Sequence, residues 1–158
     1  MEIEIQIIQP GNIEDFYELI KVFEIVFEME SFNRPTPTHI NNLIKQQNFF
    51  AVTAKTNDKI IAGLTLYILD QYYSEKPLAY IYDLAVLTEY QRKGVGRKLI
   101  EFVNEYCKVN GCKEVFVQAD KADDYAIHFY RSTKPTNEEQ VVHFTYKLFG
   151  DKLHSKNQ

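Results

Sequence analysis

The sequence predicts a single α/β domain in which helices flank a mixed sheet. Alternating apolar residues mark short strands, apolar residues at helical spacing mark helices, and turn residues separate the two kinds of segment. With 158 residues and 45% hydrophobic composition, the chain is long enough to bury one substantial core. We therefore expect one domain over residues 1–150 and a frayed tail over residues 151–158.

The N-terminal third reads as a strand followed by two helices. Alternating isoleucines predict the strand over residues 3–7, and apolar residues at helical spacing after the suitable cap Asn12 predict the first helix. Pro35 and Pro37 cannot continue that helix, so we expect a loop there. Thr38 is then a suitable cap for a short second helix.

The rest of the chain alternates strands with helices. Thr56-Asn57-Asp58-Lys59 has the composition of a hairpin turn, and Gly111 is a suitable stop for a helix. We expect strands over residues 49–56, 60–69, 78–86, 114–119 and 141–148, and helices over residues 97–109 and around Phe129 and Tyr130.

The most informative stretch is a glycine turn between a strand and a helix. The strand ends in Leu84-Ala85-Val86, and Gln91-Arg92-Lys93-Gly94-Val95-Gly96 precedes the helix. The first N–H groups of a helix lack intrahelical partners and lie at the positive end of its dipole, which suits an anion. Gly94 and Gly96 let backbone approach a phosphate closely. The turn therefore predicts a site for the pyrophosphate of a nucleotide-bearing cofactor.

The spacing of the glycines excludes two common phosphate-binding motifs. A Walker phosphate loop needs two glycines separated by four residues and then Lys-Ser/Thr, which this chain does not contain. A dinucleotide fingerprint needs a third glycine where this chain has Leu99.

The pattern that remains, Gln-x-x-Gly-x-Gly after a strand ending in Leu-Ala-Val, resembles the acetyl-CoA-binding motif of the GNAT acetyltransferase superfamily. The resemblance continues through the strand at residues 114–119 to the short helix that carries Tyr130. Within the superfamily, three segments look like those of the aminoglycoside 3-N-acetyltransferases: residues 80–86, residues 117–120 with Asp123-Asp124, and Val142-His143-Phe144.

The resemblance implies the GNAT fold, with a mostly antiparallel, splayed sheet, and direct acetyl transfer from acetyl-CoA to a primary amine. It implies no metal and no covalent enzyme intermediate. Tyr130 matches the tyrosine that hydrogen-bonds the cofactor sulfur and can protonate the leaving thiolate, and the N–H near Val86 matches the group that faces the thioester carbonyl. The residues implied in cofactor binding are Leu84, Ala85, Val86, Gln91, Arg92, Lys93, Gly94, Val95, Gly96, Arg97 and Lys98.

Carboxylates near the cofactor strand are candidates for the base, because an amine is mostly protonated at pH 7 and must lose a proton to attack. Asp83 and Asp120 are the two candidates, and the residues alone do not choose between them. The candidates for binding a cationic acceptor are Asp83, Asp120, Asp123, Asp124 and Glu28. Asp123 and Asp124 are also candidate helix caps.

Composition limits the other classes of partner. A formal net charge of −4 argues mildly against nucleic acid, and the scattered histidines do not have the spacing of a metal site. Cys107 and Cys112 read as reduced thiols. We expect a cytoplasmic protein, because the sequence has no secretory signal and no apolar run of about twenty residues. A homodimer is possible by analogy with the family.

The preferred acceptor is the 3-amino group of an aminoglycoside antibiotic, which implies a resistance activity. The alternatives are another amine, such as a polyamine, an amino acid or a protein N-terminus, and a non-catalytic acetyl-CoA sensor. One segment departs from the family. After Tyr130, where the family has a glycine turn, this chain reads Arg131-Ser132-Thr133-Lys134-Pro135. This loop borders the acceptor site in the family, so the departure bears on which acceptor the resemblance implies.

Overall fold

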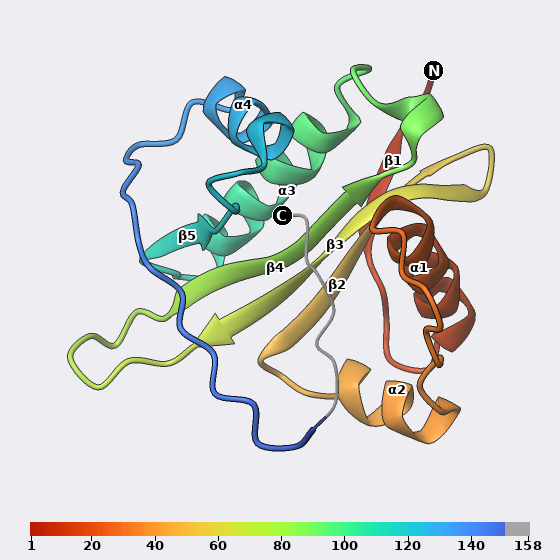
Figure 1. Ribbon diagram of the computed structural model, residues 1–158, viewed down its shortest axis with the longest axis horizontal. Coiled ribbons are helices and arrows are strands. Elements are labelled where there is room, and N and C mark those ends of the chain that lie inside the picture. The colour runs from red at the N-terminus through yellow and green to blue at the C-terminus, as the bar shows by residue number, and fades with distance from the viewer. Residues whose placement is uncertain (151–158) are drawn as a thin grey trace.

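A computed structural model describes residues 1–150 and arranges them as one five-stranded sheet with α-helices packed around it (Figure 1). None of the helices in this part of the chain is long and apolar enough to cross a membrane. The elements, in chain order, are β1 (Glu4–Ile7), α1 (Ile13–Val26), α2 (Pro37–Ile44), β2 (Phe49–Thr56), β3 (Lys59–Leu69), β4 (Leu78–Val86), the 3₁₀ turn η1 (Thr88–Tyr90), α3 (Val95–Val109), β5 (Glu114–Val117) and α4 (Asp124–Ser132).

The strands follow one another across the sheet in the order β1-β2-β3-β4-β5. Neighbours from β1 to β4 are antiparallel, whereas β5 is parallel to β4, because α3 carries the chain back before β5 begins. β4 pairs with β5 only as far as Ile81 opposite Val117, and it continues beside β3 as far as Val86. The sheet therefore splays along the last part of β4, as the resemblance implied.

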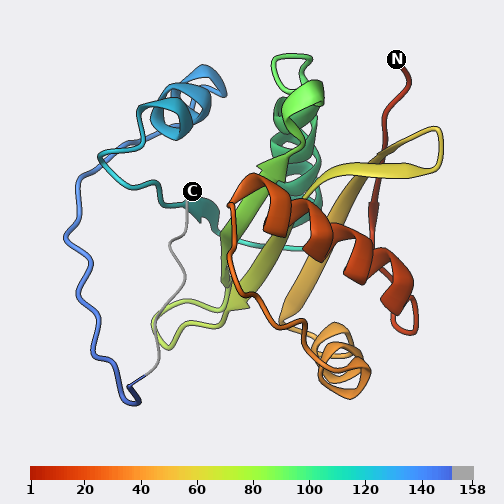
Figure 2. The same cartoon turned by 45° about the vertical axis from the view of Figure 1, so that its right-hand side comes forward.

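Helices cover the two faces of the sheet. Figures 1 and 2 show α1 lying across one face and α3 on the other, with α4 beyond the splay. Apolar residues of both helices reach the core, with Leu19 of α1 and Leu99 and Val103 of α3 almost fully buried. The amphipathic spacing that predicted these helices is thus used for packing against the sheet.

Gly63 marks the closest approach of α1 to the sheet. A Cβ added at Gly63 would lie 2.5 Å from the carbonyl oxygen of Val52 and would collide with the side chain of Leu19. We expect Gly63→Ala to lower the free energy of unfolding by about 2 kcal/mol, because overpacking a filled core displaces side chains and backbone. Urea denaturation measures the change. Gly150→Ala, where an added Cβ meets no atom within 4 Å, is the control and should leave stability unchanged.

Two expected turns and caps agree with the structure, and one differs. The Asn12 side chain accepts a hydrogen bond from Asp15 N and caps α1. Asn57 and Asp58 have φ values of 49° and 62°, as a tight hairpin turn requires. The cap of α2 was wrong: Thr36, not Thr38, accepts from His39 N. Pro37 stands at the first helical position, where its missing N–H has no intrahelical partner to lose.

The strand expected over residues 141–148 was also wrong. These residues form no strand in the structure, and every residue from 134 to 150 is exposed. Alternating apolar residues indicate that one face of a segment is apolar, but a strand also needs a hydrogen-bonding partner, which the pattern does not supply. The expected frayed tail at residues 151–158 lies outside the described residues.

Candidate active site

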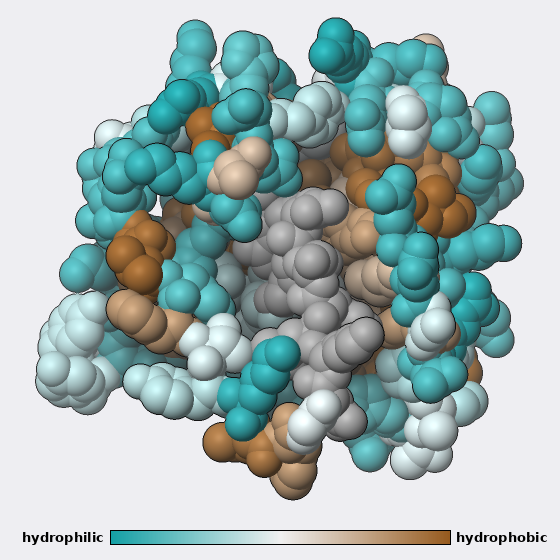
Figure 3. Space-filling view, viewed as in Figure 1, coloured by the Kyte–Doolittle hydropathy of each residue, from teal (hydrophilic) through white to brown (hydrophobic). Residues whose placement is uncertain are grey.

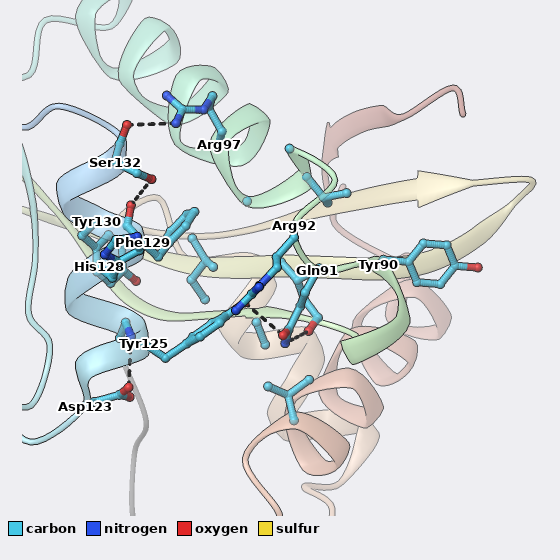
Figure 4. Close-up of a pocket in the computed structure, with 18 of the residues that line it drawn as sticks. Tyr90, Gln91, Arg92, Arg97, Asp123, Tyr125, His128, Phe129, Tyr130 and Ser132 are labelled. Carbon is cyan, nitrogen blue, oxygen red and sulfur yellow. Dashed lines mark hydrogen bonds between the residues drawn. The ribbon is translucent and has the colours of Figure 1, made fainter.

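A cavity of about 990 Å³ lies where β4 splays from β5. The end of β4, the glycine turn, the start of α3 and one face of α4 surround it (Figure 4). The lining includes most of the predicted cofactor residues: Leu84, Ala85, Val86, Gln91, Arg92, Gly94, Val95, Gly96 and Arg97. Segments far apart in the sequence therefore meet at one site.

The glycine turn leaves the N-terminus of α3 open. Gly94 has a φ of 82°, in the left-handed region, and an added Cβ there would meet no atom within 4 Å. Of the four α-helices in residues 1–150, α3 alone has no side-chain hydrogen bond at its cap. Its first N–H groups thus face the cavity without a capping side chain, which fits a pyrophosphate.

Gly96 has a different role, because it lets α4 approach α3. A Cβ at Gly96 would lie 2.8 Å from Cζ of Phe129 on α4. Any side chain at this position would have to displace the Phe129 ring. The second glycine of the motif therefore gives this ring of α4 room to pack against α3.

Gln91 and Tyr125 fix the turn in place. Gln91 Nε2 donates to the carbonyl oxygen of Val86 at 2.9 Å, and Tyr125 Oη donates to Gln91 Oε1 at 3.0 Å (Figure 4). The side-chain amide of Gln91 therefore forms hydrogen bonds with other protein groups and links the end of β4 to α4. The sequence analysis did not single out Tyr125. The one sequence signal for Tyr125 was its position four residues before Phe129, which puts the two side chains on the same face of the helix.

The basic residues of the turn divide into two groups. Arg92 and Arg97 line the cavity, and Arg97 Nη2 donates to the carbonyl oxygen of Ser132 at 2.9 Å. Lys93 and Lys98 are not among the lining residues, and Lys93 Nζ lies 5.7 Å from the centre of the Tyr90 ring. The arginines are therefore better placed than the lysines to contact a bound anion.

Tyr130 lies on α4 and lines the cavity, beside Phe129. Burial, reinforced by the negative charges of Asp123 and Asp83, raises the pKa of Tyr130 well above its usual range. The hydroxyl thus keeps its proton at every pH at which the protein would work. Such a group can donate a hydrogen bond, but it cannot serve as a base.

The predicted carboxylates occupy three kinds of position. Asp120 and Asp123 line the cavity, and each already accepts one backbone hydrogen bond, from Ala122 N and Ala126 N respectively. Asp123 is thus the cap of α4. Asp124 and Glu28 are exposed and are not among the lining residues.

Asp83 stands in β4 between a tyrosine and a cavity-lining residue. It directly precedes the lining residue Leu84 and follows Tyr82 on β4. Its charge contributes, after burial, to the raised pKa values of Tyr67 and Tyr80, as it does for Tyr130. One carboxylate oxygen of Asp83 is buried. The negative charge of this carboxylate therefore acts on tyrosines of β3, β4 and α4.

The aromatic strip runs across β3, β4 and β5. Tyr67 contacts Tyr82 with ring centres 5.8 Å apart, Tyr82 contacts Tyr80 at 5.7 Å, and Tyr80 stacks on Phe116 at 4.7 Å. All four residues are half-buried, so they form a partly accessible surface next to Asp83. The sequence analysis did not predict this strip, because its rings come from three strands whose register was unknown.

If the Tyr130 hydroxyl acts in the transition state of acetyl transfer, as the resemblance implies, its replacement with phenylalanine should lower kcat about 10- to 100-fold and change the KM for acetyl-CoA much less. The parent enzyme should also keep its kcat between pH 8 and pH 10. Because the pKa of Tyr130 is raised in the folded state, its hydroxyl stays protonated until the pH exceeds that raised pKa. The stability that the protonated form contributes is kept over the same range of pH. Steady-state kinetics over this pH range test both points. A phenylalanine variant with the parental kcat, measured where chemistry is rate-limiting, would exclude the role.

A family model supplies the identification. Residues 13–133 match the acetyltransferase (GNAT) family, a range that includes β4, the glycine turn and α4. The chain belongs to the GNAT acetyltransferase family. It is an acetyl-CoA-dependent N-acetyltransferase, and the cavity lies where the glycine turn and Tyr130 meet. Among residues 1–150, no group of three or more His, Cys, Asp and Glu residues is arranged to hold a metal ion.

Solved structures place this GNAT enzyme near aminoglycoside acetyltransferases. It is 54% identical to the aminoglycoside acetyltransferase meta-AAC0020 from an uncultured soil metagenomic sample, covering 93% of this chain and 97% of that one. The TM-scores are 0.91 for the trehalose complex and 0.92 for the sisomicin complex. The aminoglycoside acetyltransferase HMB0005, also from an uncultured soil metagenomic sample, is 31% identical over 94% of this chain and 100% of that one, with a TM-score of 0.87.

More distant structures share the fold alone. AAC(6')-Iy in complex with CoA is 13% identical, covers 92% of this chain and 95% of that one, and has a TM-score of 0.75. No curated protein sequence matches the chain.

Proposed function

We propose that this enzyme transfers the acetyl group of acetyl-CoA to an aminoglycoside, at the 3-amino group. The observation that carries the proposal is the 54% identity, over nearly the whole of both chains, to an aminoglycoside acetyltransferase whose structures include a sisomicin complex. The 3-amino position rests on the resemblance of residues 80–86, 117–120 and 142–144 to the 3-N-acetyltransferases.

The chemistry around Asp83 supports a cationic, sugar-like acceptor. The aromatic strip offers flat apolar faces on which sugar rings can pack and over which ammonium groups are attracted. Asp120 and Asp123 add negative charge in the cavity lining, and Asp83 adds it on β4 beside Tyr82. Together they suit an acceptor that carries several amines on rigid rings.

The cofactor would be held by backbone rather than by side chains. The open N–H groups at the start of α3 would bind its pyrophosphate, and the part of β4 beyond Ile81, unpaired with β5, would bind its amide-bearing arm. Acetyl-CoA supplies the activated acetyl group when bound. The arginines beside the turn, Arg92 and Arg97, would add positive charge near the phosphates.

Two side chains would then handle protons. Asp83 would take the proton from the attacking ammonium group, directly or through water, because it stands on β4 directly before the cavity-lining residue Leu84. Tyr130, which keeps its proton, would donate a hydrogen bond to the departing sulfur, which leaves as a thiolate. The base and the hydrogen-bond donor would therefore lie on different elements, β4 and α4.

The two roles of Asp123 can be separated by substitution. Asp123→Asn removes the charge but keeps an oxygen that can cap α4, so it should raise the acceptor KM a few-fold, less at high salt, and leave stability unchanged. Asp123→Ala removes both the charge and the capping oxygen, so it should also lower the free energy of unfolding by about 1 kcal/mol. Asp124→Asn is the matched control on the same helix and should change KM less. If Asp124→Asn raises the acceptor KM as much as Asp123→Asn does, Asp123 has no special role in binding the acceptor.

A panel of acceptors tests the proposed function. Acetyl-CoA-dependent thiol release should be fastest with aminoglycosides such as sisomicin, and slow with polyamines, amino acids and peptides that carry a free N-terminus. Turnover restricted to one of these other amines would replace the aminoglycoside assignment with that acceptor. Binding of acetyl-CoA without turnover on any amine would indicate a sensor.

A further inference from the structure

The pairing of β3 with β4 shifts by one residue next to Asp83. Thr65 lies opposite Asp83, whereas the next residue of β3, Leu66, lies opposite Ile81. Tyr82 is therefore the extra residue of a β-bulge in β4. Side chains alternate between the two faces of a strand, so one extra residue moves every later side chain to the other face. Such a bulge can aim a side chain beside an active site.

The register places Asp83 on the face of the sheet that α1 covers. Thr65 and Tyr67 stand two residues apart on β3 and share a face, and Asp83 lies opposite Thr65. Phe49 contacts both Tyr67 and Phe16 of α1, which identifies this face. It is the face seen in Figure 3, where hydrophobic side chains gather around α1 at the right, and β4 and β5 extend past α1 to the left in Figure 1. Without the bulge, Asp83 would lie on the opposite face, which α3 covers.

A buried hydroxyl group is hydrogen-bonded to the backbone at this bulge. Thr65 is 7% exposed, and with Thr53 and Thr56 it makes up the buried polar or charged residues of the described range 1–150. Its Oγ1 accepts a hydrogen bond from the backbone N–H of Asp83 at 3.3 Å. Burying a hydroxyl costs free energy unless it is hydrogen-bonded, and valine would suit a buried strand position better. The hydroxyl of Thr65 thus has its partner in the residue that we propose as the base.

The orientation of Asp83 decides where its negative charge acts. The pKa values of Tyr67 and Tyr80 are raised, first by burial and then by the charge of Asp83. Both tyrosines belong to the aromatic strip, on which the acceptor would pack. A rotation of the backbone at the bulge would move the carboxylate relative to the strip. The position of the proposed base therefore depends on how firmly the bulge is held.

We propose that Thr65 is a positioning residue for acetyl transfer, whose hydroxyl holds the backbone of Asp83 at the bulge so that the carboxylate faces the acceptor amine. The inference rests on the proposed role of Asp83 as the base, and it holds for any acceptor amine. Thr65 is not among the residues that line the cavity. Its loss should therefore lower the rate of the proton-transfer step and leave cofactor binding unchanged, because a misplaced base transfers protons less efficiently.

Thr65→Val keeps the shape of the side chain and removes the hydroxyl. With the amine that the enzyme acetylates fastest, kcat should fall about tenfold, and the KM for acetyl-CoA should change much less. Thr65→Ser restores the hydroxyl and should recover most of kcat, while Thr65→Ala removes it with a smaller side chain and should resemble the valine variant.

Thr53→Val is the matched control. Thr53 is fully buried on β2, its Oγ1 donates to the carbonyl oxygen of Gln6 at 3.4 Å, and it does not line the cavity. This variant also loses one buried hydrogen bond, but it should keep the parental kcat. A parental kcat in both Thr65→Val and Thr65→Ala, or an equal loss in Thr53→Val, would overturn the proposal.

A double variant separates positioning of the base from a purely structural role. If Thr65 acts through Asp83, Thr65→Val should cause no further loss of kcat once Asp83→Asn has removed the base. Thr65→Val alone should keep the fall of kcat at low pH, because its base is still present, whereas Asp83→Asn should lose it. An equal fold loss from Thr65→Val with and without Asp83→Asn would overturn the positioning role and leave Asp83 as the base. A parental kcat for Asp83→Asn would overturn the base assignment and the positioning role together.

Discussion

Replacing Gly94 with valine should weaken acetyl-CoA binding at least tenfold while the domain remains folded. Gly94 holds a φ of 82°, a conformation that a β-branched residue adopts only with strain, and it stands at the open N-terminus of α3. A valine would distort the turn and place a side chain where the phosphates approach. A tenfold loss corresponds to about 1.4 kcal/mol of binding free energy. Calorimetric titration with acetyl-CoA measures it.

Gly111 offers a matched control for the strain. It has a φ of 81° and open space around an added Cβ, but it follows the other end of α3, away from the cavity. Gly111→Val should lower stability in urea about as much as Gly94→Val and leave acetyl-CoA affinity unchanged. Unchanged affinity in the Gly94 variant, or an equal loss of affinity in the Gly111 variant, would contradict the assignment of the turn.

Replacing Asp83 with asparagine should lower kcat by about 100-fold or more, because a general base contributes on this scale. The residual activity should also lose the fall at low pH that protonation of the base produces in the parent enzyme. The amide keeps the shape of the carboxylate, so stability should change little. The pH dependence of kcat in the parent and the variant is the measurement.

Asp120→Asn distinguishes the two candidate bases. Asp120 already accepts a hydrogen bond from Ala122 N at 2.9 Å, and an asparagine oxygen can accept the same bond. We therefore expect a much smaller loss of kcat than for Asp83→Asn. If Asp120→Asn lowers kcat and removes its fall at low pH, while Asp83→Asn behaves like the parent enzyme, Asp120 is the base.

The sequence predicted the elements that depend on local pattern. The glycine turn, the cap at Asn12 and the strand from Leu78 to Val86 appear where the pattern placed them, because φ preferences, capping and periodicity act over a few residues. The splay of β4 from β5 came from the resemblance, since no local signal marks where two strands stop pairing.

Other features depend on contacts that a single sequence does not specify. Tyr125 reaches Gln91 across 34 positions of sequence, and the aromatic strip needs the register of three strands. Asp123 was predicted as a candidate cap and does cap α4, whereas only the fold shows that Asp120, chosen as a candidate base and acceptor ligand, also holds a backbone N–H. The strand prediction for residues 141–148 was wrong for the same reason. The alternation of apolar residues in a segment does not say which strand, if any, it pairs with.

The position of the new acetyl group tests the proposed activity most directly. The enzyme would be incubated with acetyl-CoA and sisomicin, and the product analysed by mass spectrometry and NMR. The account predicts one added acetyl group, on the 3-amino nitrogen. Acetylation at another amine would show that the regiochemistry is wrong, and no acetylation of any aminoglycoside under conditions where another amine is acetylated would contradict the aminoglycoside assignment.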